Sequence, residues 1–178
     1  IAEMQFADFV YPAFNQIVSE ISRMRYRSNG AFGLPMVIRM PYGGGVHGAL
    51  YHSQSNEAYF TSTVGLKVVA PGTPADAKGL LKSAIRDDDP VMFIEHHTLY
   101  QIRDEVPEGE YLVPIGKSDV KREGTDVTIV GYAQGLQVAL DAAAKLAEEG
   151  ISAEVVDLRS LRPLDMGPVV TSFKKTFR

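Results

Sequence analysis

The architecture of this chain is set by the stretch Leu66-Lys-Val-Val-Ala-Pro-Gly-Thr-Pro-Ala-Asp-Ala-Lys-Gly-Leu-Leu-Lys-Ser-Ala-Ile-Arg-Asp-Asp-Asp-Pro-Val-Met-Phe-Ile-Glu95. It begins and ends with short apolar runs, at 66–70 and 90–95, that are typical of buried strands. Between them, Thr73 can cap a helix over 74–85 that carries Pro74 in its first turn. A strand, a helix and a second strand in this order predict a βαβ unit with parallel strands and a right-handed connection.

Outward from this unit, the alternation of apolar runs and helical spacing continues in both directions. The same criteria predict strands at 1–9 (the end of one), 35–40, 126–132 and 152–158, and helices at 12–26, 56–61, 134–149 and the basic C-terminus. We therefore expect an α/β fold with three α/β/α layers around a mostly parallel sheet, followed by the beginning of a second α/β unit. That second unit is expected to bury too little surface to stand alone.

The segment from Gln101 to Gly124 differs from both halves. Charged and turn-forming residues dominate it, and no periodic pattern indicates a core-forming element. We predict a linker there.

The composition excludes several classes of function. Of 178 residues, 45% are apolar and 22% charged, as in a globular protein, and the net charge of −4 argues against nucleic acid or an anionic membrane as partner. Neither a membrane span nor a signal peptide is recognisable, so we expect an intracellular protein. Because the chain has no cysteine, disulfides, thiolate catalysis and cysteine-ligated metals are excluded.

The residues best suited to chemistry gather in the loop Tyr42-Gly-Gly-Gly-Val-His-Gly-Ala-Leu-Tyr-His-Ser-Gln-Ser-Asn-Glu-Ala-Tyr59. Its glycines can adopt positive φ and let the backbone approach a ligand closely. Its two histidines, His47 and His52, are the residue type that exchanges protons near neutral pH. We interpret this loop as the candidate active site, with the role of His47 left open between stabilising the loop and catalysis.

Other interpretations of the same residues were weighed. The segment 43–48 satisfies G-x-G-x-x-G, but no helix follows directly and no acidic residue stands about twenty positions on, so a structural glycine turn is favoured over an NAD site. A metal held by His47 and His52 lacks a carboxylate at helical spacing. His96 and His97 are expected on opposite faces of a strand end, where they cannot chelate jointly. Ser53 lacks the G-x-S-x-G elbow of a hydrolase.

The acidic run Arg86-Asp-Asp-Asp-Pro90 has two interpretations. It is either a solvated turn after the helix or, with the carbonyl groups exposed at the helix end, a place for a hard cation.

Several segments together resemble the β subunit of the thiamine-diphosphate-dependent 2-oxo acid dehydrogenases, the E1 component of the pyruvate and branched-chain dehydrogenase complexes. They are Ile1-Ala-Glu-Met-Gln-Phe-Ala-Asp-Phe9, Arg25-Tyr-Arg-Ser-Asn-Gly30, His52-Ser-Gln-Ser-Asn-Glu-Ala58, Gly65-Leu-Lys-Val-Val-Ala-Pro71, Asp76-Ala-Lys-Gly-Leu-Leu-Lys-Ser-Ala-Ile-Arg-Asp87 and Glu154-Val-Val-Asp-Leu-Arg159. The resemblance implies a pyrimidine-binding domain at 1–116 and the beginning of a transketolase-type C-terminal domain at 117–178.

The resemblance also implies cofactors and partners. The family forms α2β2 heterotetramers, active only as such, in which the α subunit holds the diphosphate and Mg2+ of thiamine diphosphate while β holds the aminopyrimidine. The assembled enzyme decarboxylates a 2-oxo acid and acylates the lipoyl group of the E2 acyltransferase. Pyruvate is the first expected substrate, with branched-chain 2-oxo acids next, and the expected location is the cytoplasm, or the mitochondrial matrix in a eukaryote.

Site residues follow from the positions of the matching motifs. Phe9 corresponds to the aromatic residue that stacks on the aminopyrimidine, and His52 to the histidine associated with transfer to the lipoyl group. A monovalent-cation site, taken to be K+, corresponds to Met36, Ala84, Ile85, Asp87 and Asp89. The glutamate that contacts the pyrimidine in this family precedes Ile1, and most of the C-terminal domain follows Arg178, so we expect an incomplete chain.

Three further hypotheses stay open. Within the same fold, the chain can belong to an acetoin dehydrogenase or to a transketolase-like enzyme that does not use a lipoyl acceptor. As it stands, it can be a non-catalytic assembly module whose value is the α-subunit interface. The last is an unrelated NAD-binding domain.

Overall fold

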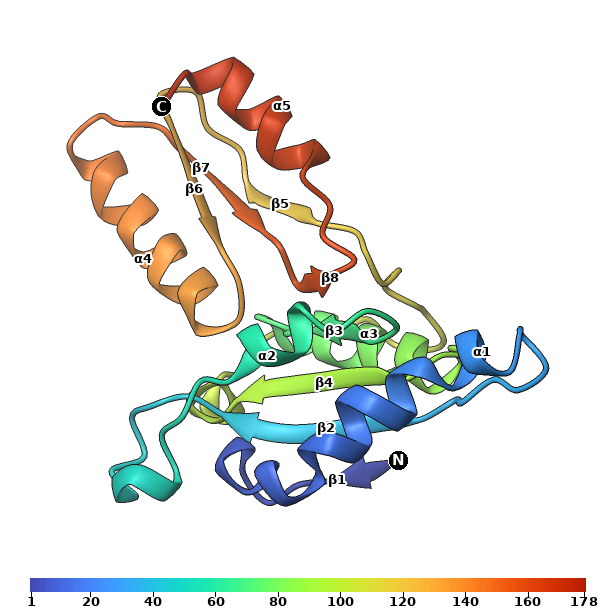
Figure 1. The fold of residues 1–178 in the computed structure, drawn as a ribbon. Coiled ribbons are helices and arrows are strands. Elements are labelled where there is room, and N and C mark those ends of the chain that lie inside the picture. Colours follow the sequence, from blue (N-terminus) through green and yellow to red (C-terminus); the bar gives the residue numbers. More distant parts are fainter.

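The computed structural model describes all 178 residues, which form two α/β units joined end to end (Figure 1). The strands are β1 (Ala2–Glu3), β2 (Val37–Tyr42), β3 (Lys67–Val69), β4 (Val91–His96), β5 (Asp119–Arg122), β6 (Val127–Gly131), β7 (Ala153–Asp157) and β8 (Ser160–Arg162). The α-helices are α1 (Met24–Arg27), α2 (Glu57–Thr61), α3 (Pro74–Ile85), α4 (Gln134–Glu148) and α5 (Gly167–Thr176). None of these helices combines the length and apolar character needed to cross a membrane.

The first unit is built on a five-stranded sheet in the order β1-β2-β4-β3-β8. Its first four strands are parallel, so the βαβ unit predicted from β3, α3 and β4 is confirmed. The predicted bounds of α3 agree with those observed, and its cap is the predicted one, because the hydroxyl of Thr73 accepts a hydrogen bond of 3.1 Å from the amide of Asp76. This side-chain cap and Pro74 explain why the sequence located the helix so well.

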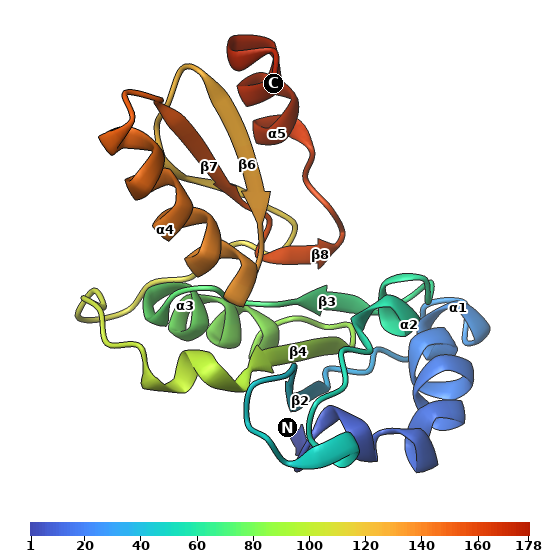
Figure 2. The same cartoon turned by 90° about the vertical axis from the view of Figure 1, so that its left-hand side faces the viewer.

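Helical segments cover both faces of this sheet. Alternate residues of β4 point to opposite sides, with Met92 and Ile94 in one apolar cluster and Val91 and Phe93 in another. The first cluster includes Val10 and Ile17 from the N-terminal helical segment, and the second includes Leu80 and Ala84 from α3. The predicted three-layer arrangement is therefore present, and Figure 2 shows its helices on the two sides of the strands.

The second unit is a three-stranded sheet in the order β5-β7-β6, with α4 and α5 on opposite faces (Figures 1 and 2). Strands β6 and β7 are parallel, while β5 is antiparallel to β7. Its core consists of Leu136, Ala139 and Ala143 of α4 packed against Ala153 and Val155 of β7. The strands and helices predicted for this region are confirmed, with bounds that differ by one or two residues.

The N-terminal prediction was only partly right. Residues 1–9 contain a two-residue strand and then a 3₁₀ turn at Ala7–Phe9, and the predicted helix at 12–26 is a chain of short 3₁₀, π and α turns. The amide of Ile21 donates to the carbonyls of both Gln16 and Ile17, so the helix widens there by one residue. Apolar spacing detects the buried face of such a segment but not the change in its hydrogen-bond pattern.

Two short edge strands were not predicted. β5 lies inside the predicted linker, and β8 leaves the second unit to pair antiparallel with β3 of the first sheet. Both have only three or four residues, which is too short for a recognisable alternation. The rest of the linker is also not featureless, because Val113 and Ile115 pack against the apolar face of α3.

Candidate functional site

Two parallel strands of the first sheet end side by side at the candidate site. Tyr42 at the end of β2 is paired in register with His96 at the end of β4. The glycine- and histidine-rich loop leaves from Tyr42, and His97 opens a 3₁₀ turn at His97–Gln101. The carboxyl edge of parallel strands is where open α/β sheets bind their ligands.

The glycine after β2 makes room for a histidine from β4. Gly43 has φ +92°, and a Cβ at this position would overlap the imidazole of His96. Gly45 has φ +105°, and a Cβ there would lie 3.1 Å from the methyl carbon of Thr98. The loop then leads into a three-residue 3₁₀ turn at Ala49–Tyr51 instead of the helix that a dinucleotide motif requires, which supports the structural interpretation of the glycines.

The two residues assigned by resemblance to catalysis and cofactor binding lie next to each other. The imidazole of His52 meets the ring of Phe9 edge-on, with 5.7 Å between centroids, and that of Phe6 at 4.5 Å. Its Nδ1 lies 3.1 Å from the carbonyl oxygen of Gly48, and its Nε2 has no hydrogen-bond partner. Phe9 is 40% exposed. The site thus offers an open aromatic ring beside a free imidazole nitrogen.

The row of rings continues toward β4. Phe6 lies 6.3 Å from His97, and the imidazoles of His97 and His96 are stacked at 5.3 Å. The prediction that these two histidines point to opposite faces was wrong, because the strand ends at His96 and His97 already belongs to the 3₁₀ turn. Adjacent histidines at the carboxyl end of a strand were the signal that could have placed them in the site.

The paired histidines are positioned by separate partners. Nδ1 of His97 lies 3.0 Å from the carbonyl oxygen of Tyr42, and Nδ1 of His96 lies 2.8 Å from the hydroxyl of Thr98. Burial, with a smaller contribution from the neighbouring His97, lowers the pKa of His96, which favours its neutral form at pH 7. The row of rings therefore ends, on the β4 side, in a histidine that favours the neutral form, His96.

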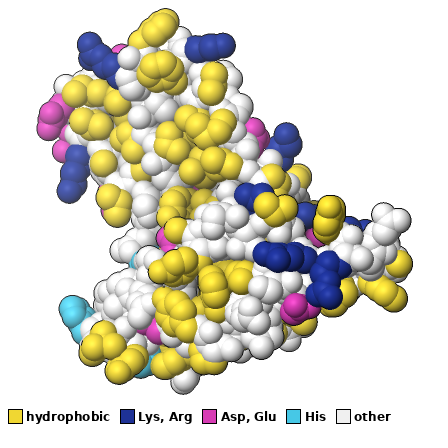
Figure 3. Space-filling view, in the orientation of Figure 1, with side chains coloured by type: hydrophobic (Ala, Val, Ile, Leu, Met, Phe, Trp, Pro, Cys, Tyr) yellow, Lys and Arg dark blue, Asp and Glu magenta, His cyan; other side chains and the backbone are white.

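His47 lies apart from this row. It is exposed, has φ +57° and makes no hydrogen bond. The surface view shows histidine side chains at the edge of the lower unit (Figure 3). No group of three or more histidine, aspartate or glutamate side chains in the chain is arranged to hold a metal ion.

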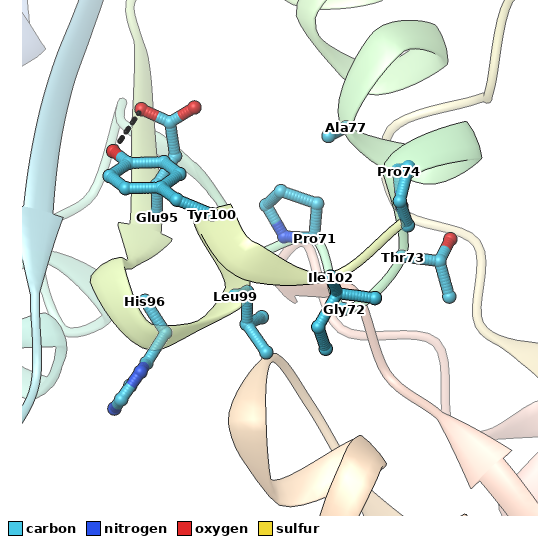
Figure 4. Close-up of a pocket in the computed structure, with 10 residues that line it drawn as sticks. All are labelled: Pro71, Gly72, Thr73, Pro74, Ala77, Glu95, His96, Leu99, Tyr100 and Ile102. Atoms are coloured by element: carbon cyan, nitrogen blue, oxygen red, sulfur yellow. Dashed lines mark hydrogen bonds between the residues drawn. The ribbon is translucent and has the colours of Figure 1, made fainter. Parts of the chain in front are cut away.

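A small cavity of about 190 Å3 opens behind β4 (Figure 4). Its lining is mostly apolar and includes the first turn of α3, but neither His52 nor Phe9 belongs to it. Its main polar group, Glu95, forms a bidentate ion pair with Arg39 and accepts a 3.4 Å hydrogen bond from Tyr100. Burial raises the pKa of Glu95, and Arg39 opposes that rise. Since this carboxylate is already partnered, the cavity has no free charged group.

The residues assigned by resemblance to a cation lie together at the opposite end of the sheet. The amide of Val91 donates to the carbonyl of Met36 at 2.9 Å, which places β2 beside the turn after α3. The carbonyl of Ala84 accepts a weak bond of 3.4 Å from Asp87, and Ile85 is the last residue of α3. The carboxylates of this group are ion-paired: Asp87 with Lys67 at 2.6 Å, and Asp89 with Lys67 and Arg25.

A second polar cluster, at the junction of the two units, was not predicted. The carboxylate of Asp76 in α3 is ion-paired with Lys121 at 2.6 Å and with Arg159 at 2.7 Å. Burial acts to raise the pKa of Asp76, but Lys121 and the other partners lower it. Asp157 is fully buried, one of its oxygens has no partner, and burial together with Asp76 raises its pKa to about 7.

Comparisons with known proteins agree with this geometry. The Transketolase, pyrimidine binding domain family matches residues 1–103, and the Transketolase, C-terminal domain family matches residues 116–178. A split gene transketolase, solved as an inactive beta4 tetramer, superposes with a TM-score of 0.78 at 29% identity, covering 98% of this chain and 54% of that one.

Three curated relatives come from Bacillus subtilis (strain 168). 2-Oxoisovalerate dehydrogenase subunit beta is 58% identical, covering 99% of this chain and 54% of the relative. Pyruvate dehydrogenase E1 component subunit beta is 51% identical, covering 100% of this chain and 55% of the relative. Acetoin:2,6-dichlorophenolindophenol oxidoreductase subunit beta is 48% identical, covering 100% of this chain and 52% of the relative. The chain spans about half the length of these relatives, and the resemblance to E1 β subunits is confirmed. It belongs to the family of transketolase pyrimidine-binding domains, here followed by a match to the transketolase C-terminal domain.

Proposed function

We propose that this chain is part of the β subunit of a thiamine-diphosphate-dependent 2-oxo acid dehydrogenase. The observation that carries the proposal is the contact between Phe9 and His52, two residues far apart in sequence whose rings lie 5.7 Å from each other. The whole enzyme would decarboxylate a 2-oxo acid and transfer the acyl group to the lipoyl group of an E2 acyltransferase.

The residues present fit the aminopyrimidine half of the cofactor. An aromatic ring with an open face suits a planar heterocycle, and Phe9 is 40% exposed. When bound, thiamine diphosphate supplies the electron sink for decarboxylation. The α subunit implied by the β-subunit relatives would hold the diphosphate and Mg2+.

His52 is suited to proton transfer at one defined atom. If Nδ1 carries the proton and donates to the carbonyl of Gly48, Nε2 is left as the acceptor. The rings of Phe6 and Phe9, both nearly perpendicular to the imidazole, hold it in this orientation. His52 would then exchange a proton at Nε2 while the acyl group passes to the lipoyl group, as a general acid or base.

Among 2-oxo acids, we propose a branched-chain substrate first and pyruvate second. Support comes from the 58% identity to a relative named for 2-oxoisovalerate, against 51% for one named for pyruvate. The sequence had led us to expect pyruvate as the first substrate and branched-chain 2-oxo acids as the second, so the comparisons reverse this order of preference. Steady-state kcat/KM of the full-length αβ enzyme for 3-methyl-2-oxobutanoate and for pyruvate decides between the two substrates. A higher kcat/KM for pyruvate would make pyruvate the preferred substrate. Transfer to an aldose instead of a lipoyl domain would favour a transketolase-like enzyme.

A K+ ion is proposed at the end of α3. Its ligands would be the carbonyl oxygens of Met36, Ala84 and Ile85, together with Asp87 and Asp89. In support, these segments lie at one corner of the sheet, where α3 ends; the carbonyl groups of Met36 and Ala84 each accept a backbone hydrogen bond and keep a second lone pair for an ion. Because Lys67 and Arg25 already balance the two carboxylates, the carbonyl groups would have to supply most of the coordination.

The experiment for the main proposal is calorimetric titration of thiamine diphosphate, with Mg2+ present, into the full-length β subunit alone and co-expressed with its α partner. We expect binding only by the pair. Phe9→Ala should weaken binding by about tenfold, the loss of one stacking contact, whereas the matched change Phe32→Ala at an exposed position outside the loop should not. A pair that fails to bind the cofactor contradicts the proposal.

A further inference from the structure

A cavity of about 430 Å3 lies between the two units, at a place that none of the roles above uses. The carboxyl ends of β2, β4 and β6 reach it through Tyr42, His96 and Gly131, and Leu158, directly after β7, completes its wall. The parallel strands of both sheets therefore end at one hollow. Such strand ends are the preferred ligand positions of α/β sheets.

Two buried side chains in the lining have polar atoms without a protein partner. Tyr42 is 4% exposed, and its hydroxyl makes no hydrogen bond. His96 is 8% exposed and uses only Nδ1, toward Thr98, so Nε2 is free. Figure 4 shows the His96 ring pointing away from the other side chains of the smaller cavity behind β4. Neither atom is among the sealed polar atoms of the protein, so both are open to a ligand in the hollow.

The first turn of α4 also faces this hollow, through Gln134 and Gly135. This helix has 15 residues, and no side chain caps it, because its N-cap position is Ala133 with φ +46°. The first amides of a helix have no partner within the helix and carry partial positive charge. Together with the Tyr42 hydroxyl, they form a set of donors that suits a carboxylate.

A negative charge, the carboxylate of Glu57, also lines the cavity. Glu57, at the start of α2, accepts a 2.9 Å hydrogen bond from the hydroxyl of Tyr132 through one oxygen, while its second oxygen is buried without a partner. Val130 and Leu158 add apolar surface. No lysine or arginine lines the hollow, so a phosphate dianion would find no counter-charge beside Glu57.

We propose that this cavity binds an α-amino acid with an aliphatic side chain. The carboxylate lies at the first turn of α4 and accepts from the Tyr42 hydroxyl, and the ammonium group donates to the free oxygen of Glu57. The side chain packs on Val130 and Leu158. A zwitterion satisfies both ends of the cavity without adding net charge. Tyr42, Ser55 and Glu57 belong to the loop that also carries His52, but neither His52 nor Phe9 lines this cavity, and the proposal does not depend on the proposed catalytic function.

The test is calorimetric titration of the full-length protein, in its native assembly and without thiamine diphosphate, with three probes of one carbon skeleton. L-Norvaline carries both charges, pentanoate lacks the ammonium group, and butylamine lacks the carboxylate. We expect norvaline to bind at least about tenfold more tightly than either of the others, the equivalent of one lost charged hydrogen bond. Equal binding of pentanoate or of butylamine, tighter binding of inorganic phosphate, or no binding of norvaline overturns the proposal.

Variants locate the binding. Glu57→Gln should weaken the binding of norvaline by about tenfold or more and leave the binding of pentanoate unchanged. Tyr42→Phe should weaken the binding of both probes by a few fold. The exposed positions Glu108→Gln and Tyr26→Phe serve as matched controls with no expected effect. Loss of norvaline binding in these controls, or its retention in Glu57→Gln, contradicts the assignment.

Gly135→Ala separates binding from folding. A Cβ at position 135 has no atom within 4 Å, so the methyl group enters free space at the first turn of α4. Because alanine favours a helix over glycine, the melting temperature should stay equal or rise. We expect norvaline affinity to fall by about tenfold in this stable variant, and unchanged affinity would place the ligand elsewhere.

Discussion

The loop around His52 and the junction around Asp76 hold polar groups in opposite ways. At the loop, the imidazole of His52 packs against two aromatic rings and keeps one nitrogen free, and Phe9 is partly exposed. At the junction, Asp76 is 3% exposed and held by both Lys121 and Arg159. Groups left free can act on a ligand, while groups fully paired within the protein fix the position of the two units.

The comparison leads to a clear expectation for mutations. Changes at the junction should lower the free energy of unfolding with little effect on the chemistry at the loop. Changes at the loop should do the reverse, unless a residue there is also needed for packing. The predictions below run from the largest expected effect to the smallest.

The largest effect on stability is expected from Asp76→Ala. It removes the buried carboxylate shared by Lys121 and Arg159 and leaves them only the more exposed Asp119, which should cost about 3 kcal/mol of unfolding free energy, the low end for breaking a buried pair. Urea denaturation of the full-length protein measures this cost. Asp141→Ala on the exposed face of α4 is the matched control and should change the value by less than about 0.5 kcal/mol. A loss below 1 kcal/mol at Asp76 would show that the junction is not held by this network.

Asp157 sharpens the comparison because it is buried at the junction with one oxygen unpaired. Its pKa is about 7 in the folded state against an ordinary 3.8, so the folded state binds the extra proton between those values. Stability should therefore fall as pH rises from about 4 to about 7 and then level off. Asp157→Asn removes this slope and should stabilise the protein at pH 8 by about 2–4 kcal/mol, with little effect at pH 4.

Melting curves at several pH values test the Asp157 prediction. The groups that face this carboxylate, Asp76, Lys121 and Arg159, stay the same in the variant, so their contributions cancel in the difference. Parallel stability profiles for wild type and variant between pH 4 and 8 would show that Asp157 does not titrate there.

Gly43→Ala tests a loop residue that is also needed for packing and should therefore affect stability. The positive φ and the overlap with the His96 imidazole should together cost about 2–3 kcal/mol. Gly44→Ala is the control next to it, because its Cβ meets no atom within 4 Å and its φ is not positive. Chemical denaturation of both variants gives the answer, and equal stability of the two would remove the argument for glycine at position 43.

The smallest effect is expected from the proposed K+ ion. At five times its dissociation constant, a bound ion adds about 1 kcal/mol to the free energy of unfolding. Replacing K+ by the bulky tetramethylammonium ion at constant ionic strength should lower the melting temperature of the full-length protein accordingly. No change in melting temperature or activity on removing K+ would count against the site at Met36, Ala84, Ile85, Asp87 and Asp89.

Local signals predicted the first unit well and long-range polar contacts poorly. Short apolar runs and the Thr73 cap located β3, α3 and β4, because each depends on neighbours in sequence. β5 and β8 were missed, since short edge strands are defined by their partners.

The candidate site shows the same division. The glycine- and histidine-rich loop was visible from composition, but the pairing of Phe9 with His52 came from the family resemblance. The stacking of His96 on His97 depended on where β4 ends, which a sequence does not fix to one residue. The junction network joins Asp76, Lys121 and Arg159, which no spacing pattern connects.

The most direct test of the account is single-turnover acyl transfer from a 2-oxo acid to a lipoyl domain by the full-length αβ enzyme carrying His52→Gln. We predict a rate lower by about 10²–10⁴-fold, the usual contribution of a proton-transfer group, with a change in unfolding free energy of less than about 0.5 kcal/mol. His47→Gln, at an exposed position of the same loop without a hydrogen bond, should keep the wild-type rate. A normal rate with His52→Gln would contradict the proposed role of the loop.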